Sequence, residues 1–322
     1  MATKGGSRVI AIEEHYFDVE LAALFSGRDV RTPPPIRERM NDLGTLRIKD
    51  MDEAGIDLQV LSHGAPSLQK LDAESAVRMA RLVNDRLHET VTGNPERFQG
   101  FAALPTADPT ASADELERCV TRLGFKGAMV HGLTGGTEFL DEKRFWPIFE
   151  RAAALDVPIY IHPSIPHEDV IQAYYKDYIE EFPGLLTAGW GFTVETATAG
   201  IRIVLSGVLE AYPNLKIILG HLGEGLPFLL VRIDEALSRE KSRLASFRDA
   251  FCEHFWITTS GNFSDTALLC SVMEMGADRI IFSVDYPFAS NEAGTKWMET
   301  IPLGTEDREK ILHGNAEKLL KL

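Results

Sequence analysis

Short apolar runs alternate with longer amphipathic segments along most of this chain. The apolar runs are rich in β-branched and aromatic residues and end in Gly, Pro or a polar residue, which is typical of buried parallel strands. They cover residues 9–15, 58–64, 98–105, 125–132, 157–163, 215–223, 255–262 and 279–287. Helical periodicity between and after them predicts helices over residues 46–54, 73–93, 110–123, 141–155, 194–211, 226–237, 266–275 and 305–320.

This alternation predicts an α/β fold, namely a (β/α)8 TIM barrel. A doubly wound open sheet is the alternative, but no G-x-G-x-x-G sequence opens the first helix. The 322 residues exceed the ~250 of an ordinary barrel, and the excess lies in two insertions, residues 16–44 and 164–193. Each insertion follows a strand, the first and the fifth, so both belong to the face where barrels build active sites. With no repeat or linker in the sequence, we expect a single domain over residues 1–322.

Polar residues gather where the predicted strands end. The positions are Glu13, Glu14, His15, His63, His131, His162, His221, Asn262 and Asp285. When a barrel closes, such positions face a common cavity. Glu13 and His15 are two residues apart on one strand, so their side chains point to the same side.

A metal centre is the chemistry that this pattern favours. For any one histidine alone, a satisfied hydrogen bond at a strand end is the better explanation. For Glu13, His15, His162 and Asp285 together, coincidence is the weaker explanation. Their mixed nitrogen and oxygen donors suit Zn or Mn, and an open site of this kind suits catalysis more than structure.

The sequence resembles the amidohydrolase superfamily, and within it the group of nonoxidative decarboxylases similar to aminocarboxymuconate-semialdehyde decarboxylase. It looks most like the ortho-hydroxybenzoate branch, the gamma-resorcylate (dihydroxybenzoate) decarboxylases. The matching stretches are IEEH (12–15), RFQGFAALP (97–105), HP (162–163), IILGHLGEGLP (217–227), ITTSGNF (257–263) and ADRIIFSVDYPF (277–288). They span nearly the whole chain.

The resemblance implies one divalent metal ion, Zn or Mn, bound by Glu13, His15, His162 and Asp285, with His221 close by. Binuclear members of the superfamily use a carbamylated lysine at the end of the fourth strand. Here that strand ends in His131, and its only lysine, Lys126, lies at the opposite end. The resemblance also implies a homo-oligomer, a dimer or tetramer, and no organic cofactor.

The activity implied is decarboxylation of a small aromatic hydroxy acid. Protonating the ring carbon before C–C cleavage avoids a carbanion, and by the resemblance Asp285 is the proton donor. His221 and Glu224, three residues apart, would form a polar pair that orients the phenol. A carboxylate at the N-terminus of the following helix explains Glu224 equally well.

Further residues are candidates for contact with the substrate. They are Phe25, Asn262, Arg232, Trp190 and Phe288. For Arg232, a salt bridge within its helix is an equal alternative, and aromatic residues in long loops more often only pack.

Four positions depart from the branch pattern. The fourth strand ends in His131 where relatives usually have Asn, and His63 is unusual after the second strand. Ser164 and Ile165 follow the His-Pro pair where relatives usually have Arg and Asn. The substrate therefore need not be a simple dihydroxybenzoate. His131 and His63 either contact the substrate or are replacements of no consequence, and for His131 we favour contact.

Composition excludes several other classes of protein. With 33 Lys and Arg against 48 Asp and Glu, the net charge of -15 argues against binding of nucleic acid. Three scattered cysteines suit neither a disulfide framework nor a thiolate zinc site. No apolar run reaches the ~18 residues of a membrane span, and the first residues, MATKGGSR, lack the apolar stretch of a signal peptide. We therefore expect a cytoplasmic protein.

Two rival functions remain at this point. In a hydrolase or hydratase the same metal would activate water, with Asp285 as general base. In a catalytically silent barrel the site would bind no metal, and the intact ligand set argues against this.

Overall fold

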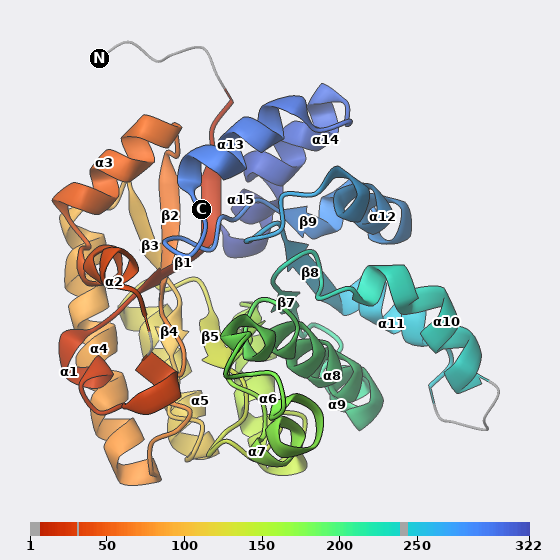
Figure 1. Cartoon of the computed structure of the whole chain (residues 1–322), viewed down its shortest axis with the longest axis horizontal. Coiled ribbons are helices and arrows are strands. Elements are labelled where there is room, and N and C mark those ends of the chain that lie inside the picture. Colours follow the sequence, from red (N-terminus) through yellow and green to blue (C-terminus); the bar gives the residue numbers. More distant parts are fainter. Residues whose placement is uncertain (1–6, 31, 239–243) are drawn as a thin grey trace.

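The strands of this protein form a closed barrel inside a ring of helices (Figure 1). The structure is a computed structural model that describes residues 7–30, 32–238 and 244–322. Its strands are β1 (Ile10–Tyr16), β2 (Leu58–His63), β3 (Phe98–Gly100), β4 (Ala102–Ala103), β5 (Ala128–His131), β6 (Ile159–His162), β7 (Ile217–Leu219), β8 (Phe255–Thr258) and β9 (Ile280–Ile281). They run parallel and neighbour one another in chain order, so the predicted (β/α)8 barrel is confirmed.

Two backbone details complete the barrel wall. Phe101 divides the third strand into β3 and β4, and its N–H donates to the Leu61 carbonyl at 2.9 Å, which keeps both halves in the wall. After β9, Glu14 of β1 pairs in parallel with Tyr286. The N–H of His15 donates to the Tyr286 carbonyl at 2.7 Å, and this pairing closes the ring between the last strand and the first.

The helices predicted from periodicity are present, with some changes of boundary. They are α3 (Thr45–Ala54), α4 (Ala73–Gly93), α5 (Pro109–Arg122), α6 (Trp146–Leu155), α8 (Gly191–Ser206), α9 (Val208–Ala211), α10 (Leu226–Ser238), α12 (Asp265–Met275), α14 (Thr305–Glu309) and α15 (Asn315–Leu320). The helix expected over 194–211 is broken by Gly207, whose φ of 95° lies in the left-handed region. The helix expected over 305–320 is broken by a π-helical turn, Lys310–Gly314.

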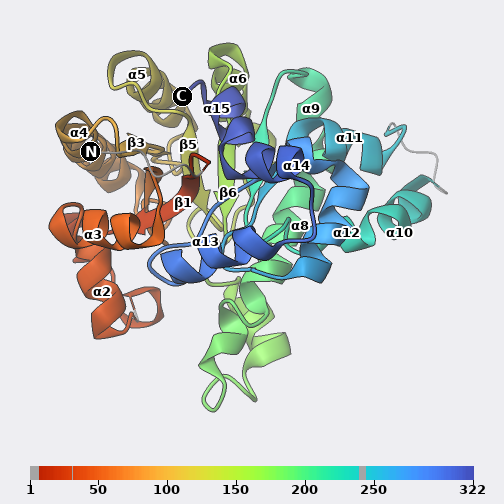
Figure 2. The ribbon, with the colours of Figure 1, turned by 90° about the horizontal axis from the view of Figure 1, so that it is seen from above.

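Some helices were not predicted. They are α1 (Val19–Ala22), α2 (Pro34–Asn41), α7 (Glu168–Val170), α11 (Phe247–His254) and α13 (Asn291–Thr300). Three of them, α1, α2 and α7, lie in the two insertions. As expected, these insertions follow the carboxyl ends of β1 and β6. The second insertion projects from the barrel as a separate lobe (Figure 2).

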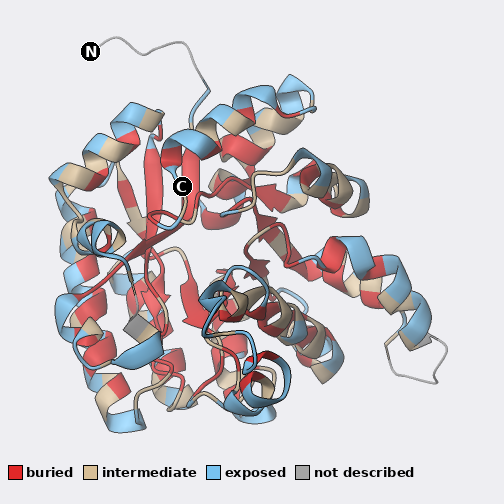
Figure 3. Ribbon diagram, in the orientation of Figure 1, coloured by how far each residue is buried: buried red, intermediate tan, exposed pale blue. Residues whose placement is uncertain are grey.

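One end of the barrel interior is filled and the other is polar. The apolar filling includes Ile12, Val60, Phe101 and Met129, and it packs against Leu319 of α15. Figure 3 shows that the strands are almost entirely buried, whereas each outer helix exposes one face. Because α15 covers the apolar end, the polar strand ends lie at the opposite mouth.

The described residues bear on two expectations drawn from composition, which concern membrane spans and the state of the cysteines. No helix among them is long and apolar enough to cross a membrane. Cys119, Cys252 and Cys270 are all free thiols. The expectation about a signal peptide falls largely on residues 1–6, which lie outside the described residues.

The fold generates a prediction about stability and pH. Glu195 on α8 is only 7% exposed, and its Oε1 has no hydrogen-bond partner in the part of the chain that the structure describes. Burial raises the pKa of Glu195 to about 7, although the charge of His167 opposes this. The folded state therefore holds this proton more tightly than the unfolded chain, and the stabilisation is lost as pH rises from the unfolded pKa to about 7. The loss is at most on the order of 3 kcal/mol.

We expect Glu195→Gln to remove this dependence. Chemical denaturation at pH 5.5 and pH 8 should show a smaller difference in the free energy of unfolding for the variant than for the wild type. Exposed Glu180 in the second insertion gives the control, since Glu180→Gln should change nothing. Equal pH dependence in wild type and Glu195→Gln would contradict the argument.

Candidate metal centre

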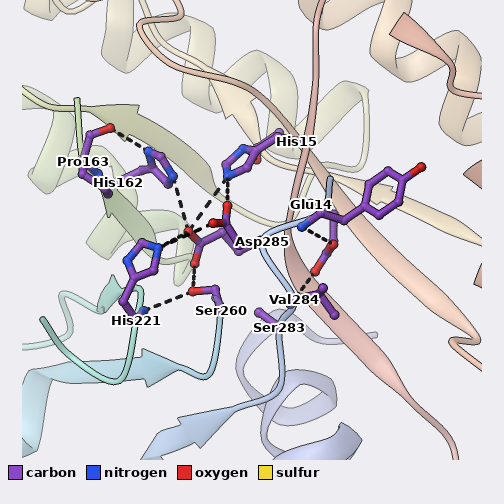
Figure 4. A network of polar contacts seen from close by, with 12 residues as sticks. Glu14, His15, His162, Pro163, His221, Ser260, Ser283, Val284 and Asp285 are labelled. Atoms are coloured by element: carbon purple, nitrogen blue, oxygen red, sulfur yellow. Dashed lines mark hydrogen bonds and ion pairs between the residues drawn. The ribbon is translucent and has the colours of Figure 1, made fainter. Parts of the chain in front are cut away.

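Four potential metal ligands meet at the polar mouth of the barrel. Glu13 and His15 come from β1, His162 ends β6, and Asp285 follows β9. Each offers one ligand atom, and these atoms all lie within 4.8 Å of one another. The structure thus brings together the four residues that the sequence analysis selected. Figure 4 shows His15, His162 and Asp285 turned toward one another.

Hydrogen bonds fix the carboxylate of Glu13. Its Oε2 accepts short hydrogen bonds from Tyr160 and Ser260, and a third from Thr258 Oγ1 at 3.1 Å. Its Oε1 is buried, has no hydrogen-bond partner among the described residues, and faces the cluster. Gly220 makes this packing possible, because a Cβ there would lie 2.9 Å from Glu13 Oε2. One oxygen is therefore anchored and the other is left for a ligand.

The two histidines also turn one nitrogen toward the cluster. His162 Nδ1 donates to the Pro163 carbonyl at 2.7 Å, so its Nε2, 3.4 Å from Glu13 Oε1, carries a lone pair. His15 Nδ1 lies 3.3 Å from Ser62 Oγ, and its Nε2 is buried without a hydrogen-bond partner. Burial and the neighbouring imidazoles lower the pKa of His162, which keeps that ring neutral.

These atoms fit a divalent cation. Buried polar atoms without partners are rare in folded proteins and indicate a missing water or ion. Here the unpartnered atoms are a carboxylate oxygen of Glu13 and a ring nitrogen of His15, both aimed at one point. Two carboxylates and two imidazoles are donors that Mn²⁺ or Zn²⁺ accepts.

Asp285 is the ligand on the open side. About 17% of its side chain is exposed, whereas those of Glu13 and His15 are fully buried. Its Oδ1 lies 3.1 Å from His15 Nε2 and its Oδ2 lies 3.9 Å from His221 Nε2. Burial by itself raises the pKa of Asp285, but the neighbouring imidazoles of His15 and His221 outweigh it, so the pKa is lowered.

His221 and Glu224 form the polar pair that the sequence predicted. His221 Nδ1 and Glu224 Oε1 are 2.6 Å apart. Both residues lie in a turn after β7 whose five residues, 221–225, all have positive φ. Burial opposes the charged form of His221, but the charges of Glu224 and Glu13 raise its pKa well above the usual value. The side chain of Glu224 is therefore bonded to His221, and no hydrogen bond joins it to the described residues of α10.

His131 and His63 are buried beside the ligands. His131 Nδ1 lies 2.9 Å from His162 Nδ1, and because that nitrogen carries the proton, His131 accepts. His63 donates from Nδ1 to the Gly64 carbonyl at 2.8 Å. Burial lowers the pKa of His63 to about 4 and that of His131 well below the usual value, so both rings are neutral. The Nε2 atom of each has no partner among the described residues.

Of the other substrate candidates, Phe288 and Asn262 contact residues of the site. The ring of Phe288, which is half exposed, lies 5.9 Å from that of His15, and Asn262 donates to the His221 carbonyl at 3.4 Å. Phe25 packs against the apolar cluster of Leu21 and Leu68. Trp190 is exposed just before α8 and Arg232 is exposed on α10. In the described structure no hydrogen bond, ion pair or ring contact joins these last three to the four ligands.

Sequence reasoning missed the residues that hold the ligands in place. Tyr160, Thr258 and Ser260 orient Glu13, and Ser62 contacts His15. A signal for Tyr160 was available, because it lies two residues before His162 on β6 and so shares its face. The hydroxyl residues carried no comparable signal.

Comparisons with known proteins agree with this geometry. The sequence profile of the family described as Amidohydrolase matches residues 17–322. This chain belongs to the amidohydrolase family. Gamma-resorcylate decarboxylase from Polaromonas sp. (strain JS666) is 41% identical over 97% of this chain and 98% of its own length. The enzyme of the same name from Rhodococcus jostii (strain RHA1) is 38% identical, with the same coverage.

Solved structures of amidohydrolases with this fold include ligand complexes. A 2,6-dihydroxybenzoate decarboxylase complexed with 2,6-dihydroxybenzoate superimposes with a TM-score of 0.90 at 38% identity, covering 98% of this chain and all of the other. The dihydroxybenzoic acid decarboxylase of Polaromonas sp. JS666, with bound manganese and the inhibitor 2-nitroresorcinol, gives a TM-score of 0.88 at 39% identity and 98% coverage of both chains.

The ligand geometry predicts the effect of removing one donor. We expect His15→Ala to raise the Kd for Mn²⁺ by more than ~100-fold. Loss of a residue that only supports a ligand already weakens metal binding about 10- to 100-fold, and His15 is itself a candidate ligand. Chelator competition measures this affinity. His88→Asn is the matched control, because the His88 ring bonds the Leu123 carbonyl, outside the cluster. Unchanged Mn²⁺ affinity in His15→Ala would show that the ion binds elsewhere.

Proposed function

We propose that this amidohydrolase is a metal-dependent, nonoxidative decarboxylase of hydroxybenzoic acids. The observation that carries this proposal is the position of Asp285. It is one of four clustered potential ligands, yet its Oδ2 faces the open side of the site beside the His221–Glu224 pair. The gamma-resorcylate decarboxylases, which match over nearly the whole chain, support the same activity.

One divalent cation would be held by Glu13, His15, His162 and Asp285, and manganese in a related structure favours Mn²⁺ over Zn²⁺. When bound, it supplies a Lewis acid for the carboxylate and the ortho hydroxyl of the substrate. The reaction needs no organic cofactor, because it exchanges a carboxylate for a proton without net oxidation or reduction.

Asp285 delivers that proton. Its carboxyl group protonates the ring carbon that bears the carboxylate, and this temporarily removes the aromaticity of the ring. The C–C bond then breaks, its electron pair restores the aromatic ring, and carbon dioxide leaves. The carboxylate of Asp285 finally takes up a proton from water, which reaches it on its exposed side.

His221 and Glu224 orient the phenol. Glu224 Oε1 fixes His221 Nδ1, so that Nε2 faces Glu13 Oε1 at 3.7 Å and Asp285 Oδ2 at 3.9 Å. In this orientation His221 Nε2 can hold the proton of the substrate phenol next to Asp285, the proton donor.

The substrate is a small aromatic carboxylic acid, and the half-exposed ring of Phe288 beside His15 forms one wall for it. We also propose substrate contacts for Asn262, Phe25, Trp190, Arg232 and His131. Asn262 is joined to the site through its bond to the His221 carbonyl. His131 would contact the substrate through Nε2, the ring atom that has no partner.

The rival hydrolase or hydratase differs in its products. Metal-loaded protein should convert 2,6-dihydroxybenzoate or a related hydroxybenzoate to the phenol and carbon dioxide, with deuterium at the vacated carbon in heavy water. Asp285→Asn should abolish turnover and keep the fold, as judged by circular dichroism. Ring opening or ester cleavage without carbon dioxide, or wild-type rates in Asp285→Asn, would overturn the proposal.

We further propose that the chain forms a dimer or tetramer. Phe228 and Val231 are exposed on α10, and Met273 is exposed on the neighbouring α12. Light scattering should give a mass of two or four chains, and Phe228→Asp should lower it. A monomeric wild type at micromolar concentration would contradict this proposal.

A further inference from the structure

Glu14 lies between two metal-ligand candidates but points away from them. Its neighbours Glu13 and His15 face the cluster, and strand alternation turns Glu14 to the other side of β1. Its carboxylate is fully buried and reaches the chain segment that carries Asp285. Oε1 accepts from the Val284 N–H at 2.9 Å, and Oε2 accepts from the Tyr286 N–H at 3.2 Å (Figure 4).

Asp285 needs such support. Its φ of 71° lies in the left-handed region, which costs a residue with a side chain on the order of 1 kcal/mol or more. The N–H of Asp285 itself donates to the Glu13 carbonyl at 3.1 Å. All three amides from Val284 to Tyr286 are therefore bonded to Glu13 or Glu14.

A chain of contacts links Glu14 to a buried arginine behind it. Gln59 Nε2 lies 3.5 Å from Glu14 Oε2, and Gln59 Oε1 accepts from the Arg47 guanidinium at 3.1 Å. Arg47, also fully buried, lies 4.6 Å above the ring of Tyr286 and donates to the His15 carbonyl. The buried arginine thus contacts both chain segments that supply ligands, one through the His15 carbonyl and the other through the ring of Tyr286.

We propose that Glu14 is a positioning residue for Asp285. Its carboxylate holds the backbone of residues 284–286 in the left-handed turn, so that the Asp285 side chain stays in the cluster even before a metal binds. Arg47, through Gln59, fixes this carboxylate in turn. This inference deepens the proposed function. Of its tests, only the measurement of decarboxylation depends on that function.

Glu14→Gln tests the proposal, because an amide keeps one acceptor but sets an NH₂ group against a backbone N–H. We expect the Kd for Mn²⁺ to rise about 10- to 100-fold, as for other outer partners of metal ligands. Decarboxylation should lose kcat more than it raises KM, and hydrogen exchange at the amides of Val284 and Tyr286 should become faster. Wild-type Mn²⁺ affinity and exchange in a folded Glu14→Gln protein would overturn the proposal.

Glu115 provides the matched control. It is also a buried carboxylate, bonded to Asn84 and Arg118 outside the site. Glu115→Gln should lower the free energy of unfolding without changing Mn²⁺ affinity or exchange at residues 284–286. An equal loss of Mn²⁺ affinity in this variant would assign the effect to general destabilisation and overturn the proposal.

A measurement on the wild type is independent of whether the variant folds. In metal-free protein, the amides of residues 284–286 should be protected from hydrogen exchange, since Glu13 and Glu14 bind them without the ion. If these amides become protected only after Mn²⁺ is added, the metal holds the turn and Glu14 does not. If no hydroxybenzoate is decarboxylated while the exchange and affinity results hold, the proposed function fails and the positioning role stands.

Discussion

Buried negative charge is the constraint on which the mouth of this barrel depends. Glu13 and Asp285 bring two carboxylates to one place, and Glu13 is fully removed from water. No lysine or arginine among the described residues forms an ion pair with either of them. Burying a carboxylate costs several kcal/mol and raises the pKa of Glu13, although the nearby charge of His221 opposes this. A divalent cation would remove this cost, and the neutral ring of His162 beside it would add a lone pair rather than a repelling charge.

The closure of the barrel and the construction of the site use the same residues. β1 offers Glu13 and His15 from one face, while its backbone and Glu14 bind the segment that closes the ring after β9. A change that shifts this segment therefore affects the wall of the barrel and the ligand Asp285 together. The apolar filling near α15 keeps the other end rigid and leaves chemistry to one mouth.

Much of this arrangement could be predicted from the sequence. Parallel strands buried on both faces appear as apolar runs, and a polar residue at the end of such a run must face the mouth, which selected Glu13, His162 and Asp285. The direction of Glu224 could not be predicted, because both a bond to His221 and a place at a helix terminus satisfy the same spacing. The structure decides this through the 2.6 Å contact with His221. The contacts of Phe25 could not be predicted either, because an aromatic residue in a long insertion gives no periodic signal of what it packs against.

The central claim is that four strand-end side chains hold one divalent ion beside Asp285. A crystal structure of the Mn²⁺-loaded protein with the nonreactive analogue 2-nitroresorcinol, using anomalous scattering to locate manganese, tests it most directly. The account predicts one manganese peak bonded to Glu13, His15, His162 and Asp285, with the ring of the analogue against Asp285 and His221. Two metal ions, or a single ion bound away from Glu13 and His15, would contradict it.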